Sequence, residues 1–165
     1  MERPILVVTS STDATSTFLC DILGQKGIPY IRFNTEEYPH PVSIHWQISP
    51  YSAPIFFGER QIDTGSIKSI WYRRPAPPSI SPNIIEDSAR EFTRRECEGA
   101  LAAVWQNIDV LWVNHPINIR YATRKPHQLH LASTLGFKVP DTILSADKKR
   151  VLKFWKGHNE SLIFK

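Results

Sequence analysis

The sequence predicts an α/β protein of three layers, with helices on both sides of a mostly parallel sheet, from three observations. An apolar run at Ile5–Thr9 is followed by a helical pattern and then by a second apolar run at Ile28–Phe33. A long helical pattern at Ile84–Trp105 precedes another short apolar run at Val110–Val113. Helices placed between strands are the crossovers that parallel strands require. With 41% apolar and 22% charged residues, the composition is that of a globular protein.

Capping and turn residues define the opening strand–helix–strand unit. Ser11–Asp13 offers three side chains that can cap a helix N-terminus. The helix ends at Gly24 or Gly27, and the second strand closes at Asn34, where the polar loop NTEEYPHP begins. The apolar stripe of the helix consists of Phe18, Leu19, Ile22 and Leu23.

The middle of the chain predicts further strands before the long helix. Val42–Ile48 alternates between apolar and polar residues, as a half-exposed strand does. Pro54–Phe57 and Arg60–Ile62 flank Gly58 and predict a hairpin. Ile67–Arg73 is another apolar strand, and the four prolines of the PAPPSISP segment after it indicate an extended loop.

The last third of the chain differs from the rest in charge. Residues 1–119 hold 10 Lys and Arg against 13 Asp and Glu, whereas residues 120–165 hold 10 against 3. We therefore expect a domain boundary near His115–Thr123, with residues 1–116 in one domain and residues 117–165 in another. The second part predicts helix, strand, helix and strand in turn, the strands being VPDTIL and SLIFK. Its basic residues fit a solvated helix face or an anionic ligand such as ATP, and no nucleic-acid-binding motif accompanies them.

Several classes of protein are excluded. No apolar run approaches 18 residues and no signal peptide is recognisable, so neither membrane insertion nor secretion is expected. The cysteines, Cys20 and Cys97, are too few for a disulfide framework or a zinc site, which favours reduced thiols and a cytoplasmic protein. The turn TSSTDATS has no glycine, which excludes a dinucleotide-binding loop. His127 and His130 lack an acidic or cysteine partner for a metal.

Two adjacent arginines end the strand IWYRR. Neighbouring residues on a strand point to opposite faces, so Arg73 and Arg74 cannot both face solvent on a half-buried strand. A buried guanidinium needs an acidic partner, and Glu96 falls on the expected inward stripe of the long helix. That stripe consists of Ile85, Ala89, Phe92, Gly99 and Ala103. Two interpretations stay open: a structural ion pair with Glu96, or an arginine that binds a substrate carboxylate or phosphate at the strand's end.

The order of IWYRRP, FTRRECEGALAAV, LWVNHP, KPHQLHLASTLGFKVPDTILS and LIFK resembles the N-terminal half of the microviridin (graspetide) type of ATP-grasp ribosomal peptide maturases. The resemblance covers nearly the whole chain. It implies a Rossmann-like pre-ATP-grasp domain over residues 1–116, followed at residues 117–165 by the beginning of an ATP-grasp domain. Enzymes of this family activate a side-chain carboxylate of a precursor peptide as an acyl phosphate, and a hydroxyl or amine of the same peptide then closes an ω-ester or ω-amide ring.

The resemblance also implies cofactors and site residues. Lys125 and Lys165 match the two ATP-grasp lysines that reach the phosphates of ATP. No catalytic residue and no metal ligand is expected within the segment, because the Mg²⁺ ligands, the glycine-rich loop and the adenine-binding hinge of the family would follow Lys165. The segment alone is therefore expected to be inactive, as the N-terminal part of a longer enzyme or a truncated gene product.

Two functions from different classes remain. One is the N-terminal portion of a peptide ligase, whose partner is a ribosomal precursor peptide with its leader and core. The other is a non-catalytic binding module, a pre-ATP-grasp domain that contacts a peptide or a partner ligase. A homodimer is left open, and neither nucleic acid nor a membrane is an expected partner.

Overall fold

The computed structural model describes residues 3–47, 55–57 and 64–164, and these form two compact units. The first unit is Met1–Pro116 and the second is Ile117–Lys165. Each unit has its own elements and is described by itself.

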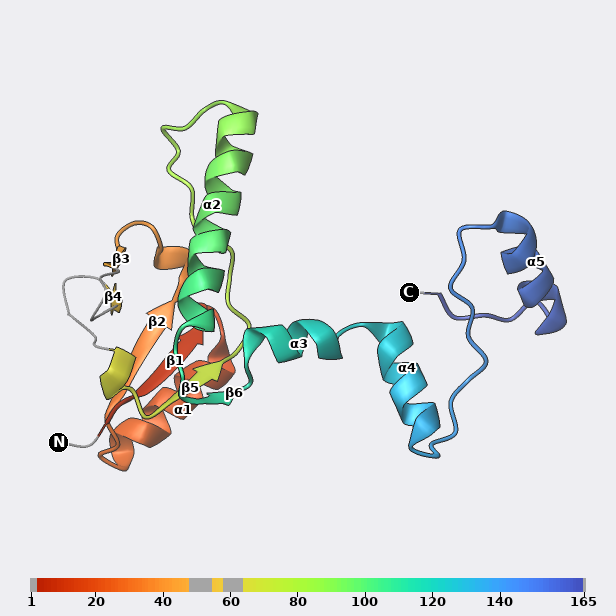
Figure 1. Ribbon diagram of the computed structural model, residues 1–165, viewed down its shortest axis with the longest axis horizontal. Coiled ribbons are helices and arrows are strands. Elements are labelled where there is room, and N and C mark those ends of the chain that lie inside the picture. The colour runs from red at the N-terminus through yellow and green to blue at the C-terminus, as the bar shows by residue number, and fades with distance from the viewer. Residues whose placement is uncertain (1–2, 48–54, 58–63, 165) are drawn as a thin grey trace. The chain divides into compact units, whose positions relative to one another are not determined.

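A four-stranded sheet forms the centre of the first unit (Figure 1). Its strands are β1 (Ile5–Thr9), β2 (Tyr30–Asn34), β5 (Ser69–Tyr72) and β6 (Leu111–Val113). They lie in the order β2-β1-β5-β6, and every neighbouring pair is parallel. The predicted α/β fold with a parallel sheet is thus confirmed.

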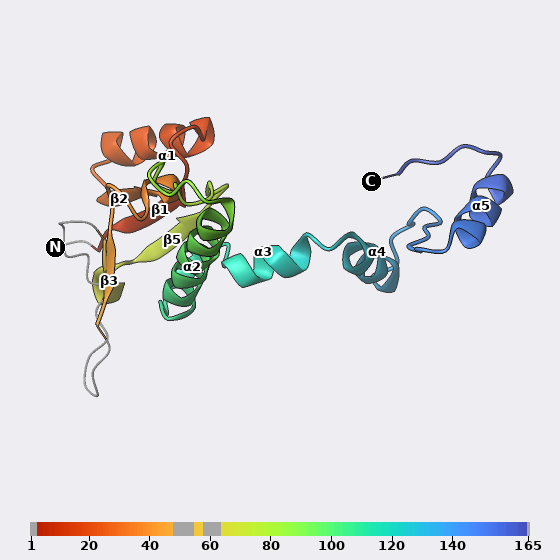
Figure 2. The same ribbon diagram turned by 90° about the horizontal axis from the view of Figure 1, so that it is seen from above.

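Two helices cover opposite faces of this sheet, as Figure 2 shows for α1 (Ala14–Gln25) and α2 (Asp87–Gln106). Alternation along β1 sends Val7 toward α1, where it packs with Cys20 and Leu23. Leu6 and Val8 point the other way, into the larger core beneath α2. That core also contains Phe33, Ile67, Ile70, Leu101, Val104, Trp105 and Ile108. The protein therefore has the three layers that the sequence predicts.

The inward face of α2 differs from the predicted one. Its buried residues are Cys97, Leu101, Val104 and Trp105, all in the second half of the helix. Ile85 precedes the helix and is 89% exposed, Phe92 is 61% exposed, and Glu96 is exposed. The predicted stripe ran through both halves of the helix, from Ile85 to Ala103, but the residues of α2 that join the core, Leu101, Val104 and Trp105, all lie in its second half.

A second, two-stranded sheet pairs β3 (Ile44–Trp46) with β4 (Ile55–Phe57) in antiparallel fashion. The predicted hairpin joined Pro54–Phe57 to Arg60–Ile62 instead. Residues 60–62 lie outside the described residues, whereas β4 pairs with the predicted strand at Val42–Ile48. Two short 3-10 helices, Thr35–Glu37 and Thr64–Ser66, precede β3 and β5 respectively.

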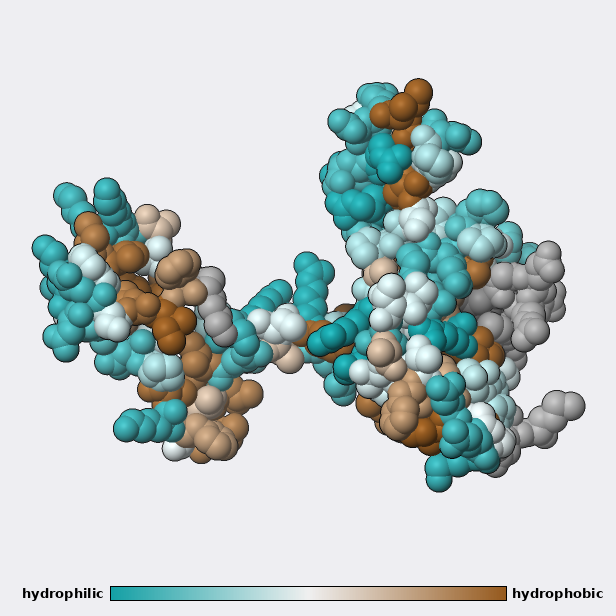
Figure 3. Space-filling model, turned by 180° about the vertical axis from the view of Figure 1, so that it is seen from behind, coloured by the Kyte–Doolittle hydropathy of each residue, from teal (hydrophilic) through white to brown (hydrophobic). Residues whose placement is uncertain are grey.

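The second unit contains the helices α4 (Lys125–Thr134) and α5 (Lys148–Gly157), and α3 (Pro116–Ala122) leads into it. The two predicted helices are present, but the predicted strands at residues 139–144 and 161–165 are not formed over the residues that the structure describes. A strand needs a neighbour for its backbone hydrogen bonds, and the described residues supply none to these segments. None of the described residues from 117 onward is buried, and apolar side chains gather on the surface of this unit (Figure 3).

Candidate functional site

The carboxyl ends of β1, β2 and β5 meet at one edge of the sheet because the three strands are parallel. The segments that follow are polar: Ser10–Asp13 after β1, Thr35–Glu37 after β2, and Arg73–Arg74 after β5. Open α/β sheets bind their ligands outside this edge. These three segments, together with Arg32 of β2, whose side chain contacts the first of them, form the candidate site, which we call the carboxyl edge.

Asp13 lies at the centre of the carboxyl edge and caps α1. Its buried carboxylate accepts hydrogen bonds through Oδ2 from the Ser16 backbone N–H at 3.0 Å and the Ser16 hydroxyl at 2.5 Å. The Thr9 hydroxyl donates to the Ser16 Oγ at 2.9 Å and completes the cluster. The hydrogen bond from the Ser16 hydroxyl lowers the pKa of Asp13 most, burial raises it, and the Ser16 N–H, Arg73 and Arg74 lower it further, so that the net shift is downward. Asp13 is therefore a structural anion.

Arg73 pairs with this carboxylate. Its Nε lies 3.3 Å from Asp13 Oδ2, and its Nη2 donates to the Thr15 hydroxyl at 3.2 Å. The predicted ion pair with Glu96 is wrong, because Glu96 lies on the exposed side of α2 and forms none of the ion pairs among the described residues. The acidic partner that the guanidinium needs comes from the start of α1 instead, and the pair fixes the end of β5 to that helix.

Arg74 is arranged differently from its neighbour. It is exposed, it makes no hydrogen bond or ion pair with the described residues, and its φ of 43° lies in the left-handed region. Hydrogen bonds hold the chain on both sides: the Arg73 N–H donates to the Val8 carbonyl at 2.9 Å, and the Thr35 hydroxyl donates to the Ala76 carbonyl at 2.6 Å. Of the two arginines, only Arg74 is available to a ligand.

Two further charged residues of the edge were not predicted. Arg32 donates to the Ser10 carbonyl at 2.8 Å and the Thr17 hydroxyl at 2.9 Å, so it joins β2 to the loop before α1. Glu36 accepts the Ser11 N–H at 2.6 Å. Burial raises the pKa of Glu36, but the hydrogen bonds from Ser11, the backbone N–H of Glu36 itself and the charge of Arg32 together outweigh burial, so the net shift is downward. Arg32 and Glu36 both lie in the RFNTEEYP segment, where a predicted strand ends and a polar loop begins. That position is the feature of the sequence that could have indicated them as site residues.

The two lysines predicted to bind ATP belong to the second unit. Lys125 begins α4, is exposed, and donates from Nζ to the Gln128 Oε1 at 2.8 Å. The second lysine, Lys165, lies outside the described residues. Among the residues that the structure describes, no group of three or more His, Cys, Asp or Glu is placed to hold a metal ion. Lys125 can thus offer one cation to a phosphate.

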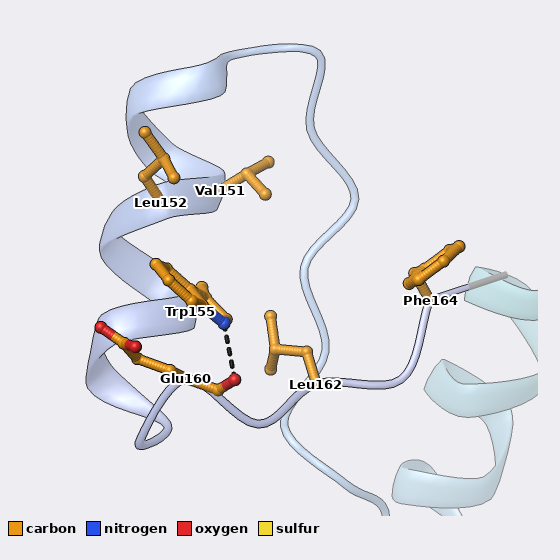
Figure 4. A pocket seen from close by; sticks show the side chains of 6 residues that line it. All are labelled: Val151, Leu152, Trp155, Glu160, Leu162 and Phe164. Atoms are coloured by element: carbon orange, nitrogen blue, oxygen red, sulfur yellow. Dashed lines mark hydrogen bonds between the residues drawn. The ribbon is translucent and has the colours of Figure 1, made fainter.

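An open apolar groove of about 550 Å³ lies beside α5 in the second unit (Figure 4). Its lining consists of Val151, Leu152, Trp155, Glu160, Leu162 and Phe164. The Trp155 indole N–H donates to the Glu160 carbonyl at 2.7 Å and closes the turn after the helix. Phe164 is 94% exposed, so the groove is open on that side.

No helix among the described residues is long and apolar enough to cross a membrane.

Comparison with known families identifies one match. Residues 4–120 match the model of the family described as the MvdD pre-ATP grasp domain. No protein with a curated description matches the chain.

Solved structures give the same result for the fold. The macrocyclase MdnC bound with precursor peptide MdnA, from Microcystis aeruginosa MRC, is 22% identical with a TM-score of 0.85, over 94% of this chain and 52% of MdnC. A RiPP-associated ATP-grasp ligase of Chryseobacterium gregarium, in complex with ADP and a leader and core peptide, is 22% identical with a TM-score of 0.84, over 95% and 48%. The macrocyclase MdnB from Microcystis aeruginosa MRC is 25% identical with a TM-score of 0.82, over 93% and 51%. The chain spans about half the length of these proteins.

Proposed function

The chain belongs to the MvdD pre-ATP-grasp domain family, and from this premise we propose that it is the N-terminal portion of an ATP-dependent peptide ligase. The observation that carries the proposal is the family match over residues 4–120, which includes the carboxyl edge and reaches α3. The similarity to ligases crystallised with precursor peptides supports a ribosomal peptide as the substrate.

The proposed reaction joins two side chains of one peptide. ATP, held with Mg²⁺, supplies the phosphoryl group that converts a side-chain carboxylate into an acyl phosphate, and a hydroxyl or amine of the peptide then displaces phosphate to form an ω-ester or ω-amide. Relatives solved with ADP, or with Mg and ADP, support these cofactors. We assign no step of the chemistry to the described residues, among which no group of three or more His, Cys, Asp or Glu is placed to hold a metal ion.

Within this chain, we propose that Lys125 and Lys165 contact the phosphates. An ammonium is a compact charge suited to phosphoryl oxygens, and its removal costs one charge-assisted contact. The exposed Nζ of Lys125, whose one hydrogen bond among the described residues goes to the Gln128 amide, can be recruited by a nucleotide at small cost.

The test measures peptide-dependent ADP release by the protein that carries these residues, with mass spectrometry of the peptide. We expect the peptide to lose one water for each ring formed. Lys125→Ala should reduce kcat/KM for ATP by about 10- to 150-fold, while Lys153→Ala, on exposed α5, should leave it unchanged. ATP turnover without peptide dehydration, or dehydration insensitive to Lys125→Ala, would contradict the respective part of the proposal. The non-catalytic binding module is the outcome if no ADP forms.

A further inference from the structure

On the basis of the proposed ligase function, we propose that Arg74 binds an acidic side chain of the peptide substrate at the carboxyl edge. The ligand is a single carboxylate, and the Asp13–Arg73 ion pair beside it is a structural support. The proposal adds a substrate-binding residue to the first unit, which holds neither of the two lysines proposed to contact ATP.

The first argument is the availability of the charge. The other cations of the carboxyl edge are occupied: Arg73 by Asp13 and Thr15, and Arg32 by the Ser10 carbonyl and the Thr17 hydroxyl. Arg74 is exposed and has no such partner among the described residues. A ligand can therefore bind its guanidinium without first breaking a protein contact.

The second argument is backbone strain. A φ of 43° is uncommon for a residue other than glycine, asparagine or aspartate. Arg74 also precedes Pro75, and a residue before proline normally adopts the extended region. The hydrogen bonds to Val8 and from Thr35 to Ala76 hold this conformation in place. Strain that is maintained at a residue without a packing role points to a function for its side chain.

The third argument concerns the chemistry of the ligand. A guanidinium presents parallel N–H donors that match the two oxygens of a carboxylate or of a phosphate. The carboxyl edge holds three anionic and three cationic side chains, namely Asp13, Glu36, Glu37, Arg32, Arg73 and Arg74. Because these charges balance, the edge lacks the positive excess that a multiply charged phosphate requires, and a singly charged carboxylate fits it better.

The test is an NMR titration of the 165-residue chain with N-acetylglutamate N-methylamide, its glutamine analogue and inorganic phosphate. We expect the glutamate probe to shift the amide signals of residues 72–74, of Ala76 and of the loop after β1, with an affinity roughly tenfold above that of the glutamine analogue. Added salt should weaken binding of the glutamate probe. Equal binding of the two analogues, or preferential binding of phosphate, would overturn the proposal.

Variants locate the contact. Arg74→Gln should abolish the difference between glutamate and glutamine, and Arg74→Lys should retain only part of it because the paired donors are lost. Arg95→Gln, which removes an exposed arginine of α2, is the matched control and should bind as the unaltered chain does. Unfolding by urea checks that each variant is folded. A folded Arg74→Gln variant that still prefers glutamate would refute the assignment.

The outcome is separable from that of the proposed function. The probe titration needs no ATP, so a failed titration leaves the ligase proposal standing on ADP release. If the chain binds the glutamate probe through Arg74 but the protein that carries it performs no ATP-dependent ligation, the ligase proposal is refuted and the proposed carboxylate site stands.

Discussion

The two units of the chain differ in where their apolar residues lie. In the first unit, both faces of a parallel sheet are covered, and side chains such as Leu6, Val8 and Ile70 are completely buried. In the second unit, the helices are equally regular, yet no described residue is buried and Leu144, Ile163 and Phe164 are each more than 80% exposed. The first unit has a core that can stabilise it, whereas the described residues of the second form helices without one.

This difference shows that local helical pattern and tertiary stability are separate properties. The helix α5 has a capping aspartate and a one-sided apolar stripe, as good helices do. Most of the stability of a helix in a protein nevertheless comes from packing its apolar face. Measurements on matched residues of the two units test whether packing accounts for this difference.

The largest difference should come from a matched pair of leucines. Leu101 is 6% exposed in the core beneath α2, and Leu152 is 41% exposed on α5. We expect Leu101→Ala to lower the free energy of unfolding by about 2–5 kcal/mol, from lost burial and the cavity left behind. Leu152→Ala should change it by less than ~0.5 kcal/mol. Urea unfolding followed by circular dichroism measures both changes. Similar losses of unfolding free energy for the two variants would contradict the contrast between the units.

A smaller difference should come from the two capping aspartates. The Asp13 side chain is 6% exposed, and that of Asp147, which accepts the Lys149 N–H at 2.8 Å, is 51% exposed. Asp13→Ala removes a cap and leaves Arg73 without its anion, and should cost about 1–3 kcal/mol. Asp147→Ala should cost at most about 1 kcal/mol.

The carboxylate of Asp13 also predicts how stability depends on pH. Because the folded chain holds the pKa of Asp13 below its usual value, the carboxylate contributes stability that is fully present above the unfolded pKa of about 3.9. That contribution is lost as the pH falls through the lower, folded pKa. Asp13→Asn should therefore flatten the acid limb of the stability profile. A variant that loses stability in acid as steeply as the unaltered chain would show that Asp13 is not the group responsible.

The sequence predicted the elements of the first unit better than their contacts. Strand β1, helix α1 and strand β2 follow from an apolar run, a cap and a second run that are close together in the chain. The partner of Arg73 does not, because Asp13 lies 60 positions earlier and reaches the arginine only when β1 and β5 pair. Asp13 was noted as a cap, but sequence spacing alone favoured Glu96.

The limits in the second unit have another cause. The apolar segments at residues 139–144 and 161–165 have the composition of strands, yet a strand exists only where a neighbour completes its hydrogen bonds. The residue pattern within 117–165 could not show that such a neighbouring strand is lacking among the described residues. Likewise, Ile85 and Phe92 suggested the wrong face of α2 because they are apolar, yet both are exposed and the buried residues of the helix begin at Cys97.

Amide hydrogen exchange of the whole chain tests the central contrast most directly, since it reports the opening free energy of each element in one sample. We predict the slowest exchange for β1, β5 and the second half of α2, at rates set by global unfolding of the first unit. The amides of α4 and α5 should exchange orders of magnitude faster, at rates close to those of amides in helices that pack against no core. Protection of α4 and α5 equal to that of β1 would contradict the account, because it would require a core that the described residues of the second unit do not form.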